Sequence, residues 1–344
     1  MINIVLMNKA IIRFLLLAAV LFPAFSSCSQ GDRYSQITGY AQGGTYSVKF
    51  NLKGVKVPES EIRRTVDSIL TMVDTTLSGY NKGSQLSRFN EGGLDTPNQM
   101  FRDIYALSRK FYEETGGALD VAAGPLFDIW GFGFTSGRLP SQQAVDSVRA
   151  ICGMDKLDPG MRPVSDNVMP RLNFNAIAQG YTSDCIAHYL HSIGVRDMLV
   201  DIGEIYCEGL NPKGRPWSIG IDRPVDGNMT PGADLDGIWR GDGRGRGVVT
   251  SGNYRKYYVE DGRKYSHTID PRTGQPVQHN LLSATIVAPD AVSADAYATF
   301  CMVIGLEDAK AFINSREDLE GFLIYDNGGT MSEWASSGFN LAVD

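Results

Sequence analysis

Two oxygen-bearing side chains, Asp295 and Thr299, lie four residues apart in the segment SADAYAT. In a helix, residues at this spacing project from the same face, one turn apart. A carboxylate and a hydroxyl placed in this way supply two hard oxygen ligands of the kind that suits Mg²⁺. A structural interpretation also fits, because Ser293 would be a good N-cap and a carboxylate in the first turn is favoured by the helix dipole. The spacing alone leaves both interpretations open.

One of the four histidines, His267, stands just before a tight turn in the segment YSHTIDPRTGQPV. The Asp-Pro and Thr-Gly pairs of this segment initiate turns, and Gly274 can adopt a positive φ. The preceding run, YRKYYVEDGRKYSHTI, predicts two strands joined by its Asp-Gly pair. Turn chemistry therefore accounts for Pro271 and Gly274 but gives no reason for His267.

Two further segments could bind a ligand or could simply be packed. The alternation in LNFNAIAQGYTSD (172–184) predicts a strand that runs into a helix N-terminus, where free N–H groups bind anions, and Gly180 permits a close approach. A plain strand–helix junction also fits, and the spacing alone favours it. The segment GALDVAAGPLFDIWGFG (117–133) offers flat aromatic and backbone surfaces for a planar ring, or a packed loop corner. GYAQGGTYSV (39–48) has neither the P-loop nor the dinucleotide-binding spacing.

Composition limits the class of protein. The chain has 344 residues, 43% of them hydrophobic, which indicates a globular protein with a large core. Its formal net charge of −7 has no long basic run to offset it, which argues against a nucleic-acid partner. Cysteines 152, 185, 207 and 301 are far apart and form no CxxC pair, so a zinc site is not expected. Cys185 and Cys301 fall in apolar helical patterns typical of a core.

The N-terminus has the layout of a secretory signal. Lys9 and Arg13 precede the apolar run FLLLAAVLFPAF, which is short for a spanning helix and ends at Ser27-Cys28. This ending resembles a bacterial lipoprotein signal in which Cys28 becomes the lipidated N-terminus; ordinary cleavage nearby, with Cys28 incidental, is the alternative. We therefore expect a signal at 1–27, a tether at 28–38, one elaborate domain or two intimate ones over 39–344, and work outside the cytoplasm.

The hydrophobic periodicity predicts helices early in the chain and strands later. Helices are expected near 62–77, 101–115, 141–152, 176–193 and 293–315, and strands at TYSVKF, MLVDI, WSIGI, GVVTS, YRKYYVE, SATIVA, FLIYD and SEWASS. The Gly- and Asp-rich stretch from Arg223 to Arg246 is expected to be a long surface loop. Helices and antiparallel-looking strands grouped in this way indicate an α+β fold with helices packed on antiparallel or mixed sheets.

Taken in order, eight segments resemble the ApbE family of FAD:protein FMN transferases, from about Gly39 to the C-terminus. They are GYAQGGTYSV, LSGYNKGSQLSRFN, GALDVAAGPLFDIWGFG, LNFNAIAQGYTSD, LVDIGEIYCEG, SGNYRKYY, YSHTIDPRTGQPV and APDAVSADAYAT. The resemblance implies an ApbE-like fold and an enzyme that binds FAD and, with Mg²⁺, transfers FMN to a Ser or Thr hydroxyl of a protein. The link formed is a phosphoester and AMP is released. The implied acceptor is an envelope redox protein, and membership agrees with a lipid-anchored protein that faces the periplasm.

The resemblance also assigns residues. Asp295 and Thr299 match metal ligands, joined by Ala176 through its carbonyl, and His267 matches the histidine of a Ser-His-x-x-Asp-Pro motif and is the candidate acid/base. The positions that match FAD contacts are Gln42, Tyr80, Ala118, Leu119, Asp120, Asn173, Gln179 and Ile269. Many relatives carry Met-Gly-Thr in place of Gln42-Gly43-Gly44, Asp in place of Asn173, Lys or Glu in place of Gln179, and Gly-Gly in place of Gly203-Glu204.

Two other functions use the same residues. If water replaces the protein hydroxyl, the chain is an FAD pyrophosphatase that yields FMN and AMP. If no chemistry follows binding, it is an FAD-binding lipoprotein without catalysis, although the intact Asp295, Thr299 and His267 weigh against this.

Overall fold

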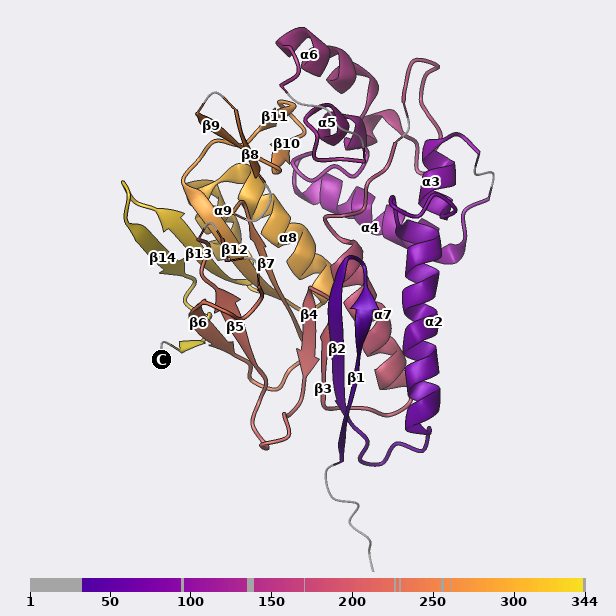
Figure 1. Cartoon of the computed structure of the whole chain (residues 1–344), viewed down its shortest axis with the longest axis vertical. Coiled ribbons are helices and arrows are strands. Elements are labelled where there is room, and N and C mark those ends of the chain that lie inside the picture. The colour runs from indigo at the N-terminus through magenta and orange to yellow at the C-terminus, as the bar shows by residue number, and fades with distance from the viewer. Residues whose placement is uncertain are drawn as a thin grey trace, which may run out of the picture.

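Figure 1 shows the computed structural model of the chain. The structure describes residues 33–93, 96–134, 139–169, 171–225, 227–228, 230–254, 257–260 and 262–342. The predicted signal and Cys28 lie outside the described residues, so the lipoprotein assignment stays a prediction. Within the described ranges, no helix combines the length and the apolar character that crossing a bilayer requires.

An eight-stranded antiparallel sheet forms the centre of the molecule. Each strand pairs antiparallel with its neighbours. In spatial order the strands are β1 (Tyr34–Ala41), β2 (Gly44–Asn51), β3 (Met198–Asp201), β4 (Ile205–Glu208), β7 (Arg246–Gly252), β12 (Leu281–Ala288), β13 (Glu320–Asp326) and β14 (Met331–Ala335). The sheet therefore joins segments from both ends of the chain.

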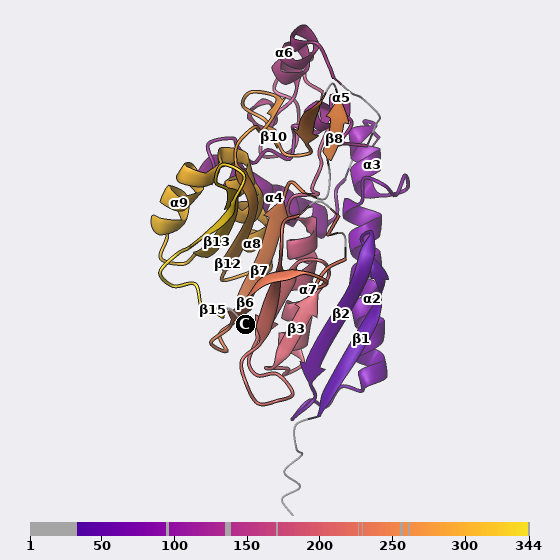
Figure 2. The same cartoon turned by 60° about the vertical axis from the view of Figure 1, so that its left-hand side comes forward.

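Helices cover one face of this sheet, as Figures 1 and 2 show. α7 (Ala178–Ser192) packs on β3 and β4, α8 (Ala291–Ile304) packs on β7 and β12, and α2 (Glu59–Leu77) packs on α7. α3 (Gln85–Asn90), α4 (Gln99–Glu114) and α9 (Leu306–Asn314) extend this layer. Two helices begin at side-chain caps: Asn98 caps α4, and Ser141, where the sequence predicts that a helix starts, caps α6 (Gln142–Ile151), each through a side-chain oxygen.

A three-stranded sheet covers the opposite face, with the order β15 (Leu341–Ala342), β6 (Leu235–Arg240) and β5 (Ser218–Asp222). Neighbouring residues of the large sheet divide between the two layers, because successive side chains of a strand point to opposite faces. Leu199 packs with Trp217 and Trp239 beneath the small sheet, whereas Val200 packs with Ile186 of α7. Both faces of the central sheet are thus buried, in a three-layer α+β arrangement.

A smaller layer lies at one end of the sheet, at the top of Figure 1. It contains α5 (Gly124–Ile129), α6, a 3₁₀ turn at Met154–Lys156, the hairpin β8 (Tyr257–Glu260)–β9 (Arg263–Ser266), and the pair β10 (Ile269–Asp270)–β11 (Gln275–Pro276). The turn after β10 follows the sequence signal, since Gly274 has a φ of +72°. A Cβ at Gly274 would also lie 2.6 Å from Val145 of α6, so both φ and packing require glycine.

The α+β fold class is confirmed, and several element predictions need correction. Residues 172–175 alternate in burial but form no strand, because Leu172 and Asn173 bond to a side chain and to a loop carbonyl and not to a ladder. The stretch 223–246 is not one loop, since it contains β6. Strand β1 begins at Tyr34, inside the predicted tether.

The start of α8 also differs from the prediction. The helix begins at Ala291 with Asp290 as its N-cap, and Asp290 accepts a hydrogen bond from Ser293 N (2.8 Å). Ser293 is therefore not the cap, and Asp295 is the fifth helical residue and not part of the first turn. The helix begins before Ser293 because Asp184 of α7 accepts hydrogen bonds from the backbone N–H groups of Ala291 and Val292.

Candidate functional site

A cavity of about 680 Å³ opens where the smaller layer at the end of the sheet meets α7, α8 and β7. Among the described residues, its lining comes from stretches that lie far apart in the chain, from Tyr80 to Val303. Nearly all the predicted site residues line it: Tyr80, Ala118, Leu119, Asp120, Asn173, Ala176, Gln179, His267, Ile269, Asp295 and Thr299. This volume suits a ligand of dinucleotide size.

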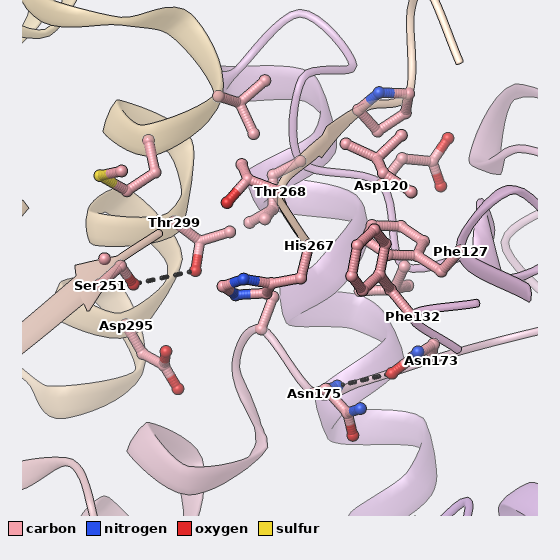
Figure 3. Close-up of a pocket in the computed structure, with 18 of the residues that line it drawn as sticks. Asp120, Phe127, Phe132, Asn173, Asn175, Ser251, His267, Thr268, Asp295 and Thr299 are labelled. Carbon is pink, nitrogen blue, oxygen red and sulfur yellow. Dashed lines mark hydrogen bonds between the residues drawn. The ribbon is translucent and has the colours of Figure 1, made fainter. Parts of the chain in front are cut away.

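One wall of the cavity carries Asp295 and Thr299, on one face of α8 as their spacing predicts (Figure 3). Asp295 is only 4% exposed, and its Oδ2 accepts a hydrogen bond from Gly180 N at 3.0 Å. Burial raises the pKa of Asp295 well above its ordinary value, and nearby Asp184 raises it further. A cation beside this carboxylate would offset the cost of burying its charge.

Ser251, at the end of β7, also faces the site. Its Oγ lies 3.4 Å from Thr299 Oγ1, as the dashed line in Figure 3 marks. Ser251 is the first residue of the family-like segment SGNYRKYY, and no role was predicted for it. No spacing signal could have found it, because 48 residues separate it from Thr299 and only the β7–α8 packing joins them.

His267 projects between the two sides of the cavity (Figure 3). It follows β9 directly, and its ring makes an edge contact with Phe132 at a centroid distance of 6.4 Å. On one side lie Asp295 and Thr299, and on the other lie Phe132 and Asn173. An imidazole in this place can reach groups held at either wall.

Aromatic rings build the opposite wall as a continuous stack. Phe132 stacks on Tyr258 with centroids 5.2 Å apart, Tyr258 stacks on Tyr265 at 5.2 Å, and Tyr265 stacks on Trp130 at 5.9 Å. The hairpin register sets the middle pair, since Tyr258 lies directly opposite Tyr265. Trp130 anchors the far end by donating to Gly274 O at 2.8 Å. Phe132 and Tyr258 line the cavity, so the stack presents a flat surface to a planar ring.

Asp120 stands between this cavity and a second, smaller one of about 190 Å³. Its carboxylate accepts hydrogen bonds from Ala122 N (2.7 Å to Oδ1) and Met154 N (3.0 Å to Oδ2). These bonds hold the 118–122 loop against the 3₁₀ turn. Burial nevertheless raises the pKa of Asp120 to about 6, because desolvation outweighs both bonds.

The remaining predicted contacts divide into two groups. Asn173 and Gln179 border the N-terminus of α7, where Asn173 Oδ1 accepts from Asn175 N (3.0 Å) and Gln179 Nε2 donates to Ile202 O (3.2 Å). Gln42 is absent from the described residues that line the cavity. It lies in the β1–β2 turn with a φ of +51°, and its Nε2 donates to Thr182 Oγ1 at 2.7 Å. Its contact with FAD stays a prediction.

The oxygen atoms of the α7–α8 wall fit a small hard cation. Among the described residues, no three His, Cys, Asp or Glu side chains converge as a metal site. A cation would therefore depend on mixed oxygen ligands: the Asp295 carboxylate, the Thr299 hydroxyl and the Ala176 carbonyl just before α7. Gly180 N occupies one lone pair of Asp295 Oδ2, and no hydrogen bond from the described residues reaches Oδ1. This donor set matches the preference of Mg²⁺ for oxygen.

The fold and the cavity together define an α+β protein that can enclose a large ligand between a ring-stacking wall and an oxygen-rich wall. The ApbE family model matches residues 42–323. The FAD:protein FMN transferase of Escherichia coli strain K12 is 32% identical over 97% of each chain, and that of Salmonella typhimurium is 33% identical over 81% of each chain.

Solved structures agree with this assignment. The flavin transferase ApbE from Vibrio cholerae superposes with a TM-score of 0.76 at 30% identity, over 89% of this chain and 98% of that one. The apo flavinyl transferase ApbE of Pseudomonas stutzeri gives a TM-score of 0.76 at 32% identity, over 89% of this chain and 95% of that one. The chain belongs to the ApbE family.

Proposed function

We propose that this chain is an Mg²⁺-dependent FAD:protein FMN transferase that moves FMN from FAD to a Ser or Thr hydroxyl of another protein. The observation that carries the proposal is the meeting, in one cavity, of the Asp295–Thr299 wall, His267 and the Phe132–Tyr258 surface. Relatives named for this activity match nearly the whole chain.

The reaction requires one bond to form and one to break. The acceptor hydroxyl oxygen forms a phosphoester with the FMN-side phosphorus, the pyrophosphate bridge breaks, and AMP leaves. The stacked face of Phe132 and Tyr258 would hold a planar ring of FAD, which places the diphosphate toward His267 and Asp295. The chain therefore contributes mainly by positioning the reacting groups.

Asp295, Thr299 and the Ala176 carbonyl would hold Mg²⁺ against the diphosphate. When bound, the ion supplies neutralisation of the charge that builds on phosphate oxygens. His267 would accept the proton of the acceptor hydroxyl as it attacks, since an imidazole titrates near neutral pH. In this proposal Asp295, Thr299 and Ala176 bind the cation, and His267 transfers the proton.

The test is incubation of the protein with FAD, Mg²⁺ and a candidate extracytoplasmic redox protein that carries a Ser or Thr acceptor. We expect flavin fluorescence that stays with the acceptor band after denaturation, together with AMP in equal amount. Free FMN and AMP without labelling would establish the pyrophosphatase instead. Binding of FAD without AMP release would establish a non-catalytic flavin carrier.

We also propose that the mature chain is anchored in the bacterial cell envelope by a lipid on Cys28 and faces the periplasm, because a lipoprotein-like signal precedes that residue. The partner would then be an extracytoplasmic redox protein. Metabolic labelling with a radioactive fatty acid, compared between wild type and Cys28→Ala, tests this; equal labelling of both would rule out the anchor.

A further inference from the structure

The N-terminal ends of α7 and α8 lie in unusually close contact. A Cβ at Gly180 of α7 would lie 2.4 Å from the carbonyl oxygen of Ala291 and 2.8 Å from Cβ of Asp295, both on α8. These distances are shorter than any real Cβ contact, so only glycine fits. The backbone of one helix therefore rests directly on the start of the other, without a side chain between them.

At this contact a carboxylate from each helix accepts hydrogen bonds from backbone N–H groups of the other. From α8, Asp295 Oδ2 accepts a hydrogen bond from Gly180 N, the third residue of α7. From α7, Asp184 accepts one bond at each oxygen, from Ala291 N to Oδ1 and from Val292 N to Oδ2, both 2.8 Å long. Ile177 at the start of α7 supplies no capping side chain of its own. The two helix starts are thus linked by a reciprocal exchange of acceptors.

We propose that Asp184 is a positioning residue for the metal site. Its two bonds fix where α8 begins relative to α7, and that relation sets how near the Asp295 carboxylate comes to the Ala176 carbonyl that precedes α7. Asp184 does not line the cavity, so its effect passes through α8. The inference rests on the proposed function for the identity of the metal.

The same helix start offers a matched control. Asp290 also accepts a hydrogen bond from an N–H of α8, that of Ser293, but it belongs to the segment of α8 itself and joins no second helix. Strand β7 supports α8 from another side, because a Cβ at Gly247 would lie 2.3 Å from Asp290 O. Loss of Asp184 should therefore shift α8 and not release it.

The experiment compares Asp184→Ala, Asp184→Asn and Asp290→Ala with the wild type. Mg²⁺ alone is titrated, without FAD, and its apparent Kd is measured by calorimetry and by the Mg²⁺-dependent rise in Tm. Both alanine variants should lower the metal-free Tm by roughly 2–4 °C through loss of a cap. Only Asp184→Ala should raise the Kd for Mg²⁺, by about tenfold, as outer-shell changes do. Asp184→Asn keeps the side-chain volume and one acceptor oxygen, so its Kd for Mg²⁺ should lie between those of the wild type and Asp184→Ala.

The outcomes separate the hypotheses. An unchanged Kd in both Asp184 variants, or an equal rise in Asp184→Ala and Asp290→Ala, would overturn the positioning role. If Asp184→Ala does not fold, Asp184→Asn decides in the same way. A wild type that binds Mg²⁺ but never labels an acceptor would defeat the proposed transferase and leave this inference standing. A wild type that transfers FMN without Mg²⁺ affecting its Tm would defeat the inference alone.

Discussion

The hydroxyl oxygens of Ser251 and Thr299 lie 3.4 Å apart and join the end of β7 to the middle of α8. Thr299 can point its hydroxyl hydrogen at Ser251 Oγ and keep a lone pair directed into the cavity. A hydroxyl that binds a cation needs this arrangement, since the oxygen and not the hydrogen must face the metal. Ser251 would thereby orient Thr299, one of the proposed metal ligands, without contacting the metal itself.

Ser251→Ala removes the acceptor for the Thr299 hydroxyl. We expect the Kd for Mg²⁺ to rise about 2–10-fold, the worth of one hydrogen bond, with FAD-saturated kcat restored by excess Mg²⁺. Activity measured against Mg²⁺ concentration checks this. Thr285→Val is the control, because it breaks the neighbouring Thr250–Thr285 contact (2.8 Å) and leaves the Ser251–Thr299 pair in place. An equal loss in both variants would contradict a specific role for Ser251.

His267→Ala removes the candidate acid/base. We expect FMN transfer to fall by about 10²–10⁴-fold, because general acid–base catalysis contributes on that order. FAD binding should change little, since the aromatic wall remains. Quenching of flavin fluorescence measures binding, and single-turnover labelling measures transfer. His188→Ala, an exposed histidine of α7, is the control. Full transfer by His267→Ala would end the assignment.

Gly180→Ala tests the close contact of α7 with α8. The new methyl group would meet backbone atoms of Ala291, which cannot rotate away, so the helices must separate. We expect a loss of about 1–3 kcal/mol in the free energy of unfolding, typical of overpacking, and weaker Mg²⁺ binding. Chemical denaturation measures the first effect. Gly194→Ala, at a glycine with a φ of +96° and open space beyond α7, should cost stability through backbone strain but leave Mg²⁺ binding intact.

Asp120 gives a signed pH prediction. Its pKa is about 6 in the folded chain against 3.8 when unfolded. Below pH 3.8 both states are protonated and the folded state has its full advantage. As the pH rises to 6 and beyond, the folded chain must carry a buried charge, so stability is lost across that window. Asp120→Asn cannot ionise, and we expect its free energy of unfolding to gain up to about 3 kcal/mol on wild type between pH 4 and pH 7.

Urea unfolding at several pH values, without FAD, measures this difference. Asp158→Asn is the comparison, because the backbone hydrogen bond from Arg162 N lowers the pKa of Asp158 and reverses the sign: wild type loses that contribution as the pH falls. A difference between Asp120→Asn and wild type that stays flat from pH 4 to pH 7 would contradict the assignment.

Local signals in the sequence predicted the parts of the site that depend on short-range geometry. Helical spacing placed Asp295 and Thr299 on one face, and the Asp-Gly and Thr-Gly pairs placed the hairpin and turn around His267. The roles of these residues came from the family resemblance, since spacing alone did not decide between a metal site and a helix start.

Features that depend on distant contacts were not predictable. Ser251 meets Thr299 only because β7 packs on α8, and Asp184 reaches α8 across 107 residues. The same Asp184 moved the start of α8 away from Ser293, the cap that the local pattern favoured. At 172–175 the alternation correctly marked buried and exposed residues. A strand also needs a partner strand to pair with, and the periodicity of a segment does not show whether one is available.

The late position of α8 in the chain affects when the proposed site can form during synthesis. β12 lies between β7 and β13, and α8, which bears Asp295 and Thr299, follows β12 in the chain. A ribosome must therefore complete most of the polypeptide before the oxygen-rich wall exists, although the Phe132 and Tyr258 rings are made earlier. A nascent chain that stops short of residue 291 would carry the Phe132 and Tyr258 rings but would lack α8, and with it Asp295 and Thr299, two of the proposed cation ligands.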